Sequence, residues 1–285
     1  MERFTFVNGK GESVVIGGHH DDFLLASHSG TTSAEVLTTA RKGFNQNGQN
    51  YVKTHLGLRI LSVSFYTPRP DDLSFYQKKR RLSAVFNPLL GEGLLTYEND
   101  FTKKCLTVSV TKMPELAEKN RVIGKYTVEL TAFDPFWYDE TETEVRLNGV
   151  TGGLSFPVQF TGAGVQFALK GARSTVTINS DVDVPITVEF SGPCDNPVFA
   201  NTSIGKKIAI RTAVAENEKI IVTTAYGNKN IYKVARNGTK TNVNNLITND
   251  TQFFSLRPGA NALTFDADTG TPEVDVRYRN LFTGV

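Results

Sequence analysis

Apolar and polar residues alternate with a period of two along most of the chain. In "CLTVSVTK", Leu106, Val108 and Val110 fall on one face, and in "KYTVELTAF" Tyr126 and Val128 begin the same pattern. Such alternation predicts strands that bury one face. Residues typical of strands fill these runs, and Gly, Pro, Asn and Asp fill the gaps between them. We therefore expect a mainly β protein made of short strands, as in sandwiches and barrels.

The second half repeats this pattern in "SFPVQF", "STVTI", "PITVEF", "KKIAIRT", "EKIIVTTAY" and "EVDVRYR". Between the halves, "DETETEVRLNGVTGG" is acidic and then rich in glycine, a composition that suits a linker. We expect an N-terminal β domain over residues 1–140 and a C-terminal β-sandwich over residues 150–285. The length of 285 residues also favours two domains.

One stretch, "RPDDLSFYQKKRRLSAVFNP", has a helical pattern instead. Two aspartates open it, where the helix dipole favours negative charge. Phe75, Leu82 and Phe86 are spaced to share one face, and Pro88 prevents any continuation. The spacing predicts one amphipathic helix over residues 71–86, packed on the first sheet.

The predicted helix carries a basic run, Lys78, Lys79, Arg80 and Arg81. Such a run is typical of a solvated helix face. Contact with an acidic protein neighbour, or with nucleic acid, is the alternative. A subunit interface is the candidate role for these four residues.

Three aromatic residues, Phe136, Trp137 and Tyr138, follow a strand in "AFDPFWYDETE". Pro135 cannot donate a ladder hydrogen bond, which fits a strand end. The aromatic group is expected either to close the first core or to stay partly exposed as a subunit interface.

Charge and composition narrow the functional classes. The net charge is +2, and no apolar run approaches the roughly 18 residues that span a bilayer, so neither nucleic acid nor a membrane is indicated as a partner. The start, "MERFTFVNGKGESV", does not resemble a secretory signal, so we expect synthesis in the cytoplasm. Cys105 and Cys194 are expected to be buried thiols rather than a disulfide or a metal site.

Catalytic and metal-binding patterns are weak. The cluster in "GGHHDDF" holds His19, His20, Asp21 and Asp22, but neighbouring residues on a strand face opposite ways and a zinc site needs spaced ligands. A polar loop is the expected interpretation. No nucleophile elbow, phosphate loop or selected carboxylate pair is found. We expect no catalytic residues, no metal and no cofactor.

The order of several segments is more specific than any one of them. These segments are "GFNQNGQNYVKTHLGLRILSVSFY", "FNPLLGEGLLTYEND", "YTVELTAFDPFWYDE", "FFSLRPGANALTFDAD" and "EVDVRYRNLFTGV". Their arrangement resembles the distal tail protein family of siphophages over nearly the full chain.

The resemblance implies a structural, non-enzymatic protein of the virion, located at the phage tail tip and assembled in the host cytoplasm. It implies a hexameric ring formed by the N-terminal domain, which joins the tail tube protein to the tail-tip or baseplate hub protein. DNA would only pass through the ring. It also implies an outer C-terminal β-sandwich of galectin or carbohydrate-module type, and a receptor-binding protein or host cell-wall polysaccharide as further partners.

Three alternatives remain open. Residues of about 19–43 depart from the shorter members of the family and could form an extended hairpin or arm that wraps a neighbour, and the segment of about 19–50 is a candidate subunit surface. The C-terminal sandwich could bind host cell-wall carbohydrate by stacking sugars on Phe199, Tyr226 and Tyr232, although these side chains could equally belong to the core. A hydrolase with unrecognised carboxylates is a third alternative.

Overall fold

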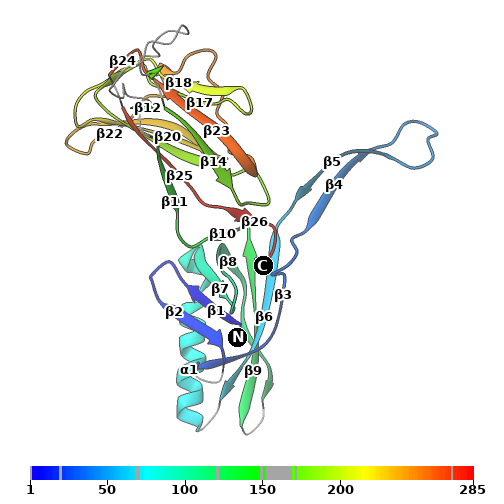
Figure 1. The fold of residues 1–285 in the computed structure, drawn as a ribbon. Coiled ribbons are helices and arrows are strands. Elements are labelled where there is room, and N and C mark those ends of the chain that lie inside the picture. Colours follow the sequence, from blue (N-terminus) through cyan, green and yellow to red (C-terminus); the bar gives the residue numbers. More distant parts are fainter. Residues whose placement is uncertain are drawn as a thin grey trace. The chain divides into compact units, whose positions relative to one another are not determined.

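The computed structural model describes residues 2–18, 21–68, 71–119, 122–147, 150–151, 169–170, 172–270 and 272–285. The chain divides into two compact units, one made of Met1–Glu140 with Phe282–Val285 and one made of Thr141–Leu281. Both are built from β-strands, and the first also contains an α-helix, as Figure 1 shows. The predicted fold class, mainly β with one N-terminal helix, is confirmed. No helix among the described residues is long and apolar enough to cross a membrane.

The first unit is organised around one large sheet. Its strands are β1 (Arg3–Val7), β2 (Ser13–Gly17), β3 (Phe23–Ser29), β6 (Arg59–Pro68), β7 (Gly93–Glu98), β8 (Lys103–Lys119), β9 (Ile123–Ala132), β10 (Trp137–Asp139) and β26 (Leu281–Phe282). Their order is β26-β10-β8-β7-β1-β2-β3-β6-β9. The long strand β8 pairs with β7 through its first part and with β9 through its second. The sheet therefore closes on itself as a barrel.

The helix α1 (Asp72–Val85) matches the predicted range closely. Asp71 caps it by accepting a hydrogen bond from the Ser74 backbone N–H at 2.8 Å. Phe75 and Leu82, seven residues or about two turns apart on one face, are each only 1% exposed, and they pack into the core of the barrel. A short 3₁₀-helix, Pro88–Leu90, follows. The helix thus covers apolar barrel residues that water would otherwise contact.

Two strands of the first unit stand outside the barrel. Figure 1 shows β4 (Val36–Arg41) and β5 (Asn50–Leu56) extending from it as a hairpin, and they pair with each other in a sheet of their own. We call residues 36–56 the arm. The predicted arm, at about 19–43 or 19–50, overlaps this hairpin but begins too early, because Phe23–Ser29 is barrel strand β3, where Phe23 is fully buried.

The described residues of the second unit form two larger sheets and two small ones. The six-stranded sheet has the order β11-β25-β15-β20-β21-β22, and the four-stranded sheet has the order β14-β23-β17-β18. Their strands are β11 (Thr143–Leu147), β14 (Ala172–Ile178), β15 (Ile186–Ser191), β17 (Val198–Asn201), β18 (Lys206–Ala209), β20 (Lys219–Ala225), β21 (Asn228–Val234), β22 (Lys240–Asn242), β23 (Gly259–Asp266) and β25 (Glu273–Tyr278).

The remaining short elements complete this unit. They are β12 (Val150–Thr151), β13 (Leu169–Lys170), β16 (Cys194–Asp195), β19 (Ala213–Val214), β24 (Thr269–Gly270) and a 3₁₀-helix, Asn244–Leu246. Side chains of both larger sheets, such as Val188 and Val222 from one and Leu263 and Phe265 from the other, form one core. This is the arrangement of a β-sandwich.

The boundary between the units differs from the predicted linker. Residues 143–147 form strand β11, which pairs with β25, because Leu147 is buried in the sandwich core and Val145 packs against that core. The acidic composition of this segment suggested a linker, but alternate side chains of the segment face inward as in a strand. The last four residues, expected in the second domain, belong to the first unit because they bind its buried Arg59 and Thr31.

Candidate assembly surfaces

The arm has almost no buried side chain. Val36 is 61% exposed, Tyr51 is 68% exposed, and Phe44 in the connecting turn is fully exposed. The turn reverses the chain with left-handed backbone at Asn45 and Gly48. Large apolar side chains on a thin hairpin are unusual for a surface that meets only water, and they are typical of a binding surface.

The arm is also basic. It contains Arg41, Lys42 and Lys53, and residues 36–56 include no aspartate or glutamate. The combination of cations with exposed aromatic and aliphatic side chains suits contact with an acidic and partly apolar protein surface.

Both ends of the arm are held by a buried arginine. Arg59 follows the arm and is 0% exposed. Its Nε donates a hydrogen bond to the Pro135 carbonyl at 2.7 Å, and its Nη1 donates to the Gly30 and Thr31 carbonyls at 2.7 and 3.0 Å. Its Nη2 donates to the Thr283 carbonyl. We call this arrangement the Arg59 clasp; it ties the segments before and after the arm to the C-terminal residues.

Trp137 completes the clasp. Its Nε1 donates to the Thr31 carbonyl at 3.0 Å, and its ring lies 5.9 Å from the Arg59 guanidinium carbon. Burial lowers the pKa of Arg59, but an arginine stays charged because its ordinary pKa is far above neutrality. Backbone carbonyls and the face of an indole ring thus stabilise this cation without a carboxylate.

A second apolar surface lies where the arm joins the barrel. Leu58, Ile60 and Phe133 are 40%, 59% and 61% exposed. Ile60 pairs with Thr131 and the next pair is Arg59 with Ala132, so the strand register brings Leu58 and Phe133 to the same end of the paired strands. This base patch is continuous in sequence with the arm.

The basic run of α1 is divided into two pairs. Arg81 binds the Asp22 carboxylate at 2.9 Å and Lys78 lies 3.9 Å from it, so these two residues join α1 to the loop before β3. Lys79 and Arg80 are exposed, and within the described part of the chain neither has an ion-pair partner.

The three aromatic residues after β9 differ in how deeply they are buried. Trp137 is fully buried, so it belongs to the core of the first unit and cannot itself touch a neighbouring subunit. Phe136 and Tyr138 are half-buried, and Tyr138 shares a hydrogen bond of 3.0 Å with Thr107. An interface role for Phe136 and Tyr138 stays a prediction.

The three aromatic residues expected to bind sugar do not form one platform. Phe199 is fully buried on the four-stranded sheet and stacks on Phe254 with ring centroids 5.6 Å apart. Tyr226 is fully exposed in the turn between β20 and β21, and Tyr232 is half-buried on β21 of the other sheet. Phe199 therefore packs the core and cannot stack on a ligand.

The metal-like cluster lies partly outside the described residues, because His19 and His20 are not among them. Asp21 accepts hydrogen bonds from Arg3 at 3.3 Å and from the Gly18 N–H at 3.0 Å, and Asp22 binds Arg81. No group of three metal-binding side chains occurs in the ranges that the structure describes.

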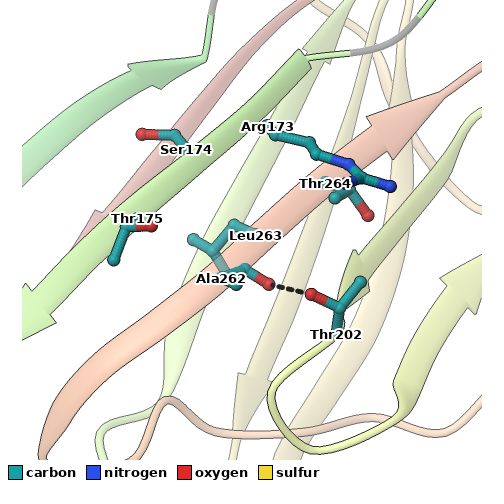
Figure 2. A pocket seen from close by; sticks show the side chains of 7 residues that line it. All are labelled: Arg173, Ser174, Thr175, Thr202, Ala262, Leu263 and Thr264. Carbon is teal, nitrogen blue, oxygen red and sulfur yellow. Dashed lines mark hydrogen bonds between the residues drawn. The ribbon is translucent and has the colours of Figure 1, made fainter.

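A shallow hollow of about 300 Å³ lies on the four-stranded sheet, and Figure 2 shows its lining. Arg173 and Thr175 come from β14, Thr264 comes from β23, and the Thr202 hydroxyl donates to the Ala262 carbonyl at 3.1 Å. The lining contains Ser and Thr hydroxyls but no carboxylate, histidine or cysteine, so it lacks the side chains that usually act as the general base for a hydroxyl nucleophile.

The clasp residue Arg59 was visible in the sequence only as a member of a strand. It lies on the same face of β6 as Leu61, Val63 and Phe65, which are all buried. A period-two pattern that places an arginine on the apolar face is a signal for a buried, hydrogen-bonded cation.

Comparisons with known proteins agree with this architecture. A family model described as "Phage tail protein RIFT-related domain" matches residues 32–132, and one described as "Siphovirus-type tail component, C-terminal domain" matches residues 179–282. Together they cover well over half of the chain. No curated protein sequence matches it.

Two solved structures share the fold. The Dit protein of SPP1, described as a paradigm of the hub adsorption apparatus in phages that infect Gram-positive bacteria, is 12% identical with a TM-score of 0.69, and the alignment covers 98% of this chain and 99% of that one. A chain of the phage P2 baseplate in its activated conformation is 10% identical with a TM-score of 0.55, and all of both chains is covered. At these identities the similarity concerns the fold.

The two domain matches lie in the order expected from the barrel and the sandwich. The first match lies within the first unit, and the second lies within the second unit except for residue 282. The chain belongs to the siphovirus distal tail protein family, and it is a structural component of the phage tail rather than an enzyme.

Proposed function

We propose that this protein forms a closed hexameric ring at the tail tip and acts as the hub that joins the tail tube protein to the baseplate proteins. The observation that carries the proposal is the arm, a basic hairpin with exposed Phe44 and Tyr51 that projects from the barrel. The descriptions of SPP1 Dit as part of a hub and of the phage P2 structure as a baseplate support the same role.

An isolated two-stranded hairpin is marginally stable in water. In the described part of the chain, β4 and β5 pair only with each other, so each keeps one free edge. A free edge can add to a neighbouring sheet, which satisfies its backbone N–H and C=O groups. A neighbouring subunit would stabilise the arm in this way.

A ring needs a contact between two different surfaces of the same subunit. The arm supplies one surface, and the base patch of Leu58, Ile60 and Phe133 supplies apolar area next to it. A stable contact buries about 1,600 Å² in total. Aromatic side chains at its centre would carry much of the binding energy, and Phe44 and Tyr51 are our candidates.

Other predicted contacts remain part of the proposal. Lys79 and Arg80 on α1 are exposed and suit an acidic neighbour, either a second subunit or another tail protein. Phe136 and Tyr138 would contribute partly exposed rings. DNA would only pass through the ring, and a receptor-binding protein would attach to the assembled hub.

The experiment compares wild-type protein with a Phe44→Ser/Tyr51→Ser variant by mass photometry, alone and with tail tube protein. Wild type is expected to give hexamers. The variant is expected to assemble at least about tenfold more weakly, because two large anchors are lost. Phe101→Ser is the matched control, since Phe101 is 96% exposed in the same unit but lies outside the arm.

If the arm variant assembled as strongly as wild type, the arm would not be part of the interface. Wild type that stays monomeric with tail tube protein would refute the ring itself. The carbohydrate alternative keeps only Tyr226 and Tyr232 as candidates, since Phe199 is buried.

A further inference from the structure

A second hollow in the sandwich, about 210 Å³ in volume, gathers unpaired positive charge. Its lining includes Lys206 at the start of β18, Lys229 on β21 and Arg257 before β23. Asp183 is the one carboxylate in the lining, so the site has a formal charge of +2. We call it the basic hollow.

The three cations differ from their neighbours in the same unit. Lys207 binds Asp250 at 2.5 Å, and Lys233 binds Glu218 at 2.8 Å. In the part of the chain that the structure describes, none of the three cations of the basic hollow has an ion-pair partner. Gathering like charges around one concavity costs free energy, and a bound anion would remove that cost.

The backbone around the hollow is well fixed. The Arg257 N–H donates to Asn261 Oδ1 at 3.1 Å, and Asn261 Nδ2 donates back to the Arg257 carbonyl at 2.7 Å, while Asn261 itself is 1% exposed. Lys229 lies opposite Thr224 in the β20–β21 pair. Phe254, which also lines the hollow, stacks on Phe199 in the core. The backbone of the site is therefore ordered before binding, and the entropy cost of binding falls on the cationic side chains.

We infer that the basic hollow binds a phosphate group. A tetrahedral phosphate offers oxygens to donors that come from several directions, whereas a carboxylate offers only two coplanar oxygens. Two ammonium groups, one guanidinium and the Ser255 hydroxyl supply such donors. A phosphate dianion also balances the formal charge of +2. This inference concerns the sandwich and does not depend on ring formation.

The test is calorimetric titration of the full chain at low ionic strength with three probes. Inorganic phosphate and glucose 1-phosphate distinguish a free ion from a phosphorylated sugar, and a triglutamate peptide represents an acidic protein segment. Saturable binding of a phosphate probe, tighter than that of the peptide, is the expected result. Tighter binding of glucose 1-phosphate than of phosphate would identify the phosphorylated sugar as the source.

Variants then locate the site. Lys229→Gln and Arg257→Gln are each expected to weaken phosphate binding about tenfold, as loss of a charged hydrogen bond does. Asp183→Asn should tighten it, because a repelling carboxylate is removed. Lys240→Gln is the matched control, an exposed lysine on β22 outside the lining.

Thermal unfolding of each variant verifies that it folds. Wild type without measurable phosphate binding, or variants that bind phosphate like wild type, would overturn the assignment. Stronger binding of the peptide than of either phosphate probe would overturn it in favour of an acidic protein partner.

Discussion

At the scale of single residues, Arg59 shows how a charge can be tolerated inside a β-barrel. Its four hydrogen bonds all go to backbone carbonyls, at Pro135, Gly30, Thr31 and Thr283. A buried donor or acceptor without a partner costs about 1–3 kcal/mol. The guanidinium therefore holds three chain segments together, because its buried N–H donors would lose their acceptors if a segment moved.

The thiol of Cys194 has a pKa well above its ordinary value. Burial raises the pKa of its thiol from 9.0 to about 11, and the charge of Asp195 acts in the same direction. The thiolate is the reactive form, so a shift of about two pKa units reduces thiolate about a hundredfold at pH 8. In a Cys105→Ala variant, iodoacetamide should label the native protein at least about a hundredfold more slowly than the unfolded protein.

The sign of the pH effect follows from the same shift. The folded thiol holds its proton more tightly than the unfolded thiol, so its contribution to stability is present below pH 9.0 and is lost as the pH rises through about 11. The labelling rate of the native protein should keep rising up to that pH. Rapid labelling at pH 8 in native protein would show that Cys194 is not enclosed as the structure has it.

At the scale of elements, α1 is attached to the barrel through a few side chains. Leu82 is 1% exposed, whereas Leu73 on the same helix is 70% exposed. Leu82→Ala should therefore lower the free energy of unfolding by about 2–5 kcal/mol, since it leaves a cavity. Leu73→Ala, with identical chemistry, should change it by less than about 0.5 kcal/mol.

Urea unfolding followed by circular dichroism measures both variants. Equal effects of the two substitutions would mean that the helix is not packed through the face that contains Leu82. Intrinsic helix propensity does not separate the variants, because both replace Leu by Ala within the same helix.

The sequence predicted those elements whose pattern matched one regular period. The alternation through Leu106, Val108 and Val110 identified part of β8, and the spacing of Phe75 and Leu82 identified α1. Both elements bury one face, and the spacing of apolar residues in the sequence predicts such a face directly.

Other features depend on contacts between distant segments, which no local pattern records. The sequence of strand β11 resembled an acidic linker. Only two of its residues, Val145 and Leu147, are apolar and face inward, and charged residues surround them. The arm strands, VLTTAR and NYVKTHL, have no period-two alternation, because almost all of their side chains are exposed. Phe199 looked equally suited to a core and to a sugar platform, and only the opposite sheet of the sandwich decides that it is buried.

At the scale of the whole molecule, the chain leaves the first unit after residue 140 and returns to it at residue 282. The returning segment is held in several ways. Thr283 supplies a carbonyl to Arg59, the Val285 N–H donates to the Thr31 carbonyl at 3.3 Å, and Lys104 Nζ lies 3.6 Å from the centroid of the Phe282 ring. The first unit is therefore completed by residues that come last in the sequence.

Deletion of residues 282–285 should consequently destabilise the first unit rather than the second. The deletion leaves one Arg59 donor without its acceptor and exposes the surface that Phe282 covers, so we expect a loss of about 2–4 kcal/mol. Trp137, the only tryptophan and a member of the Arg59 clasp, reports on the first unit alone by its fluorescence during urea unfolding.

The matched control is Thr283→Ala, which keeps the backbone carbonyl that Arg59 uses and should shift the fluorescence transition much less. Circular dichroism of the same samples would show the sandwich unfolding at its unchanged midpoint. If the deletion left the Trp137 transition where it is in wild type, the C-terminal residues would not stabilise the barrel. Because Arg59 also holds Gly30 and Thr31, a lower transition would mean that the base of the arm depends on these last residues, and with it the proposed contact between subunits.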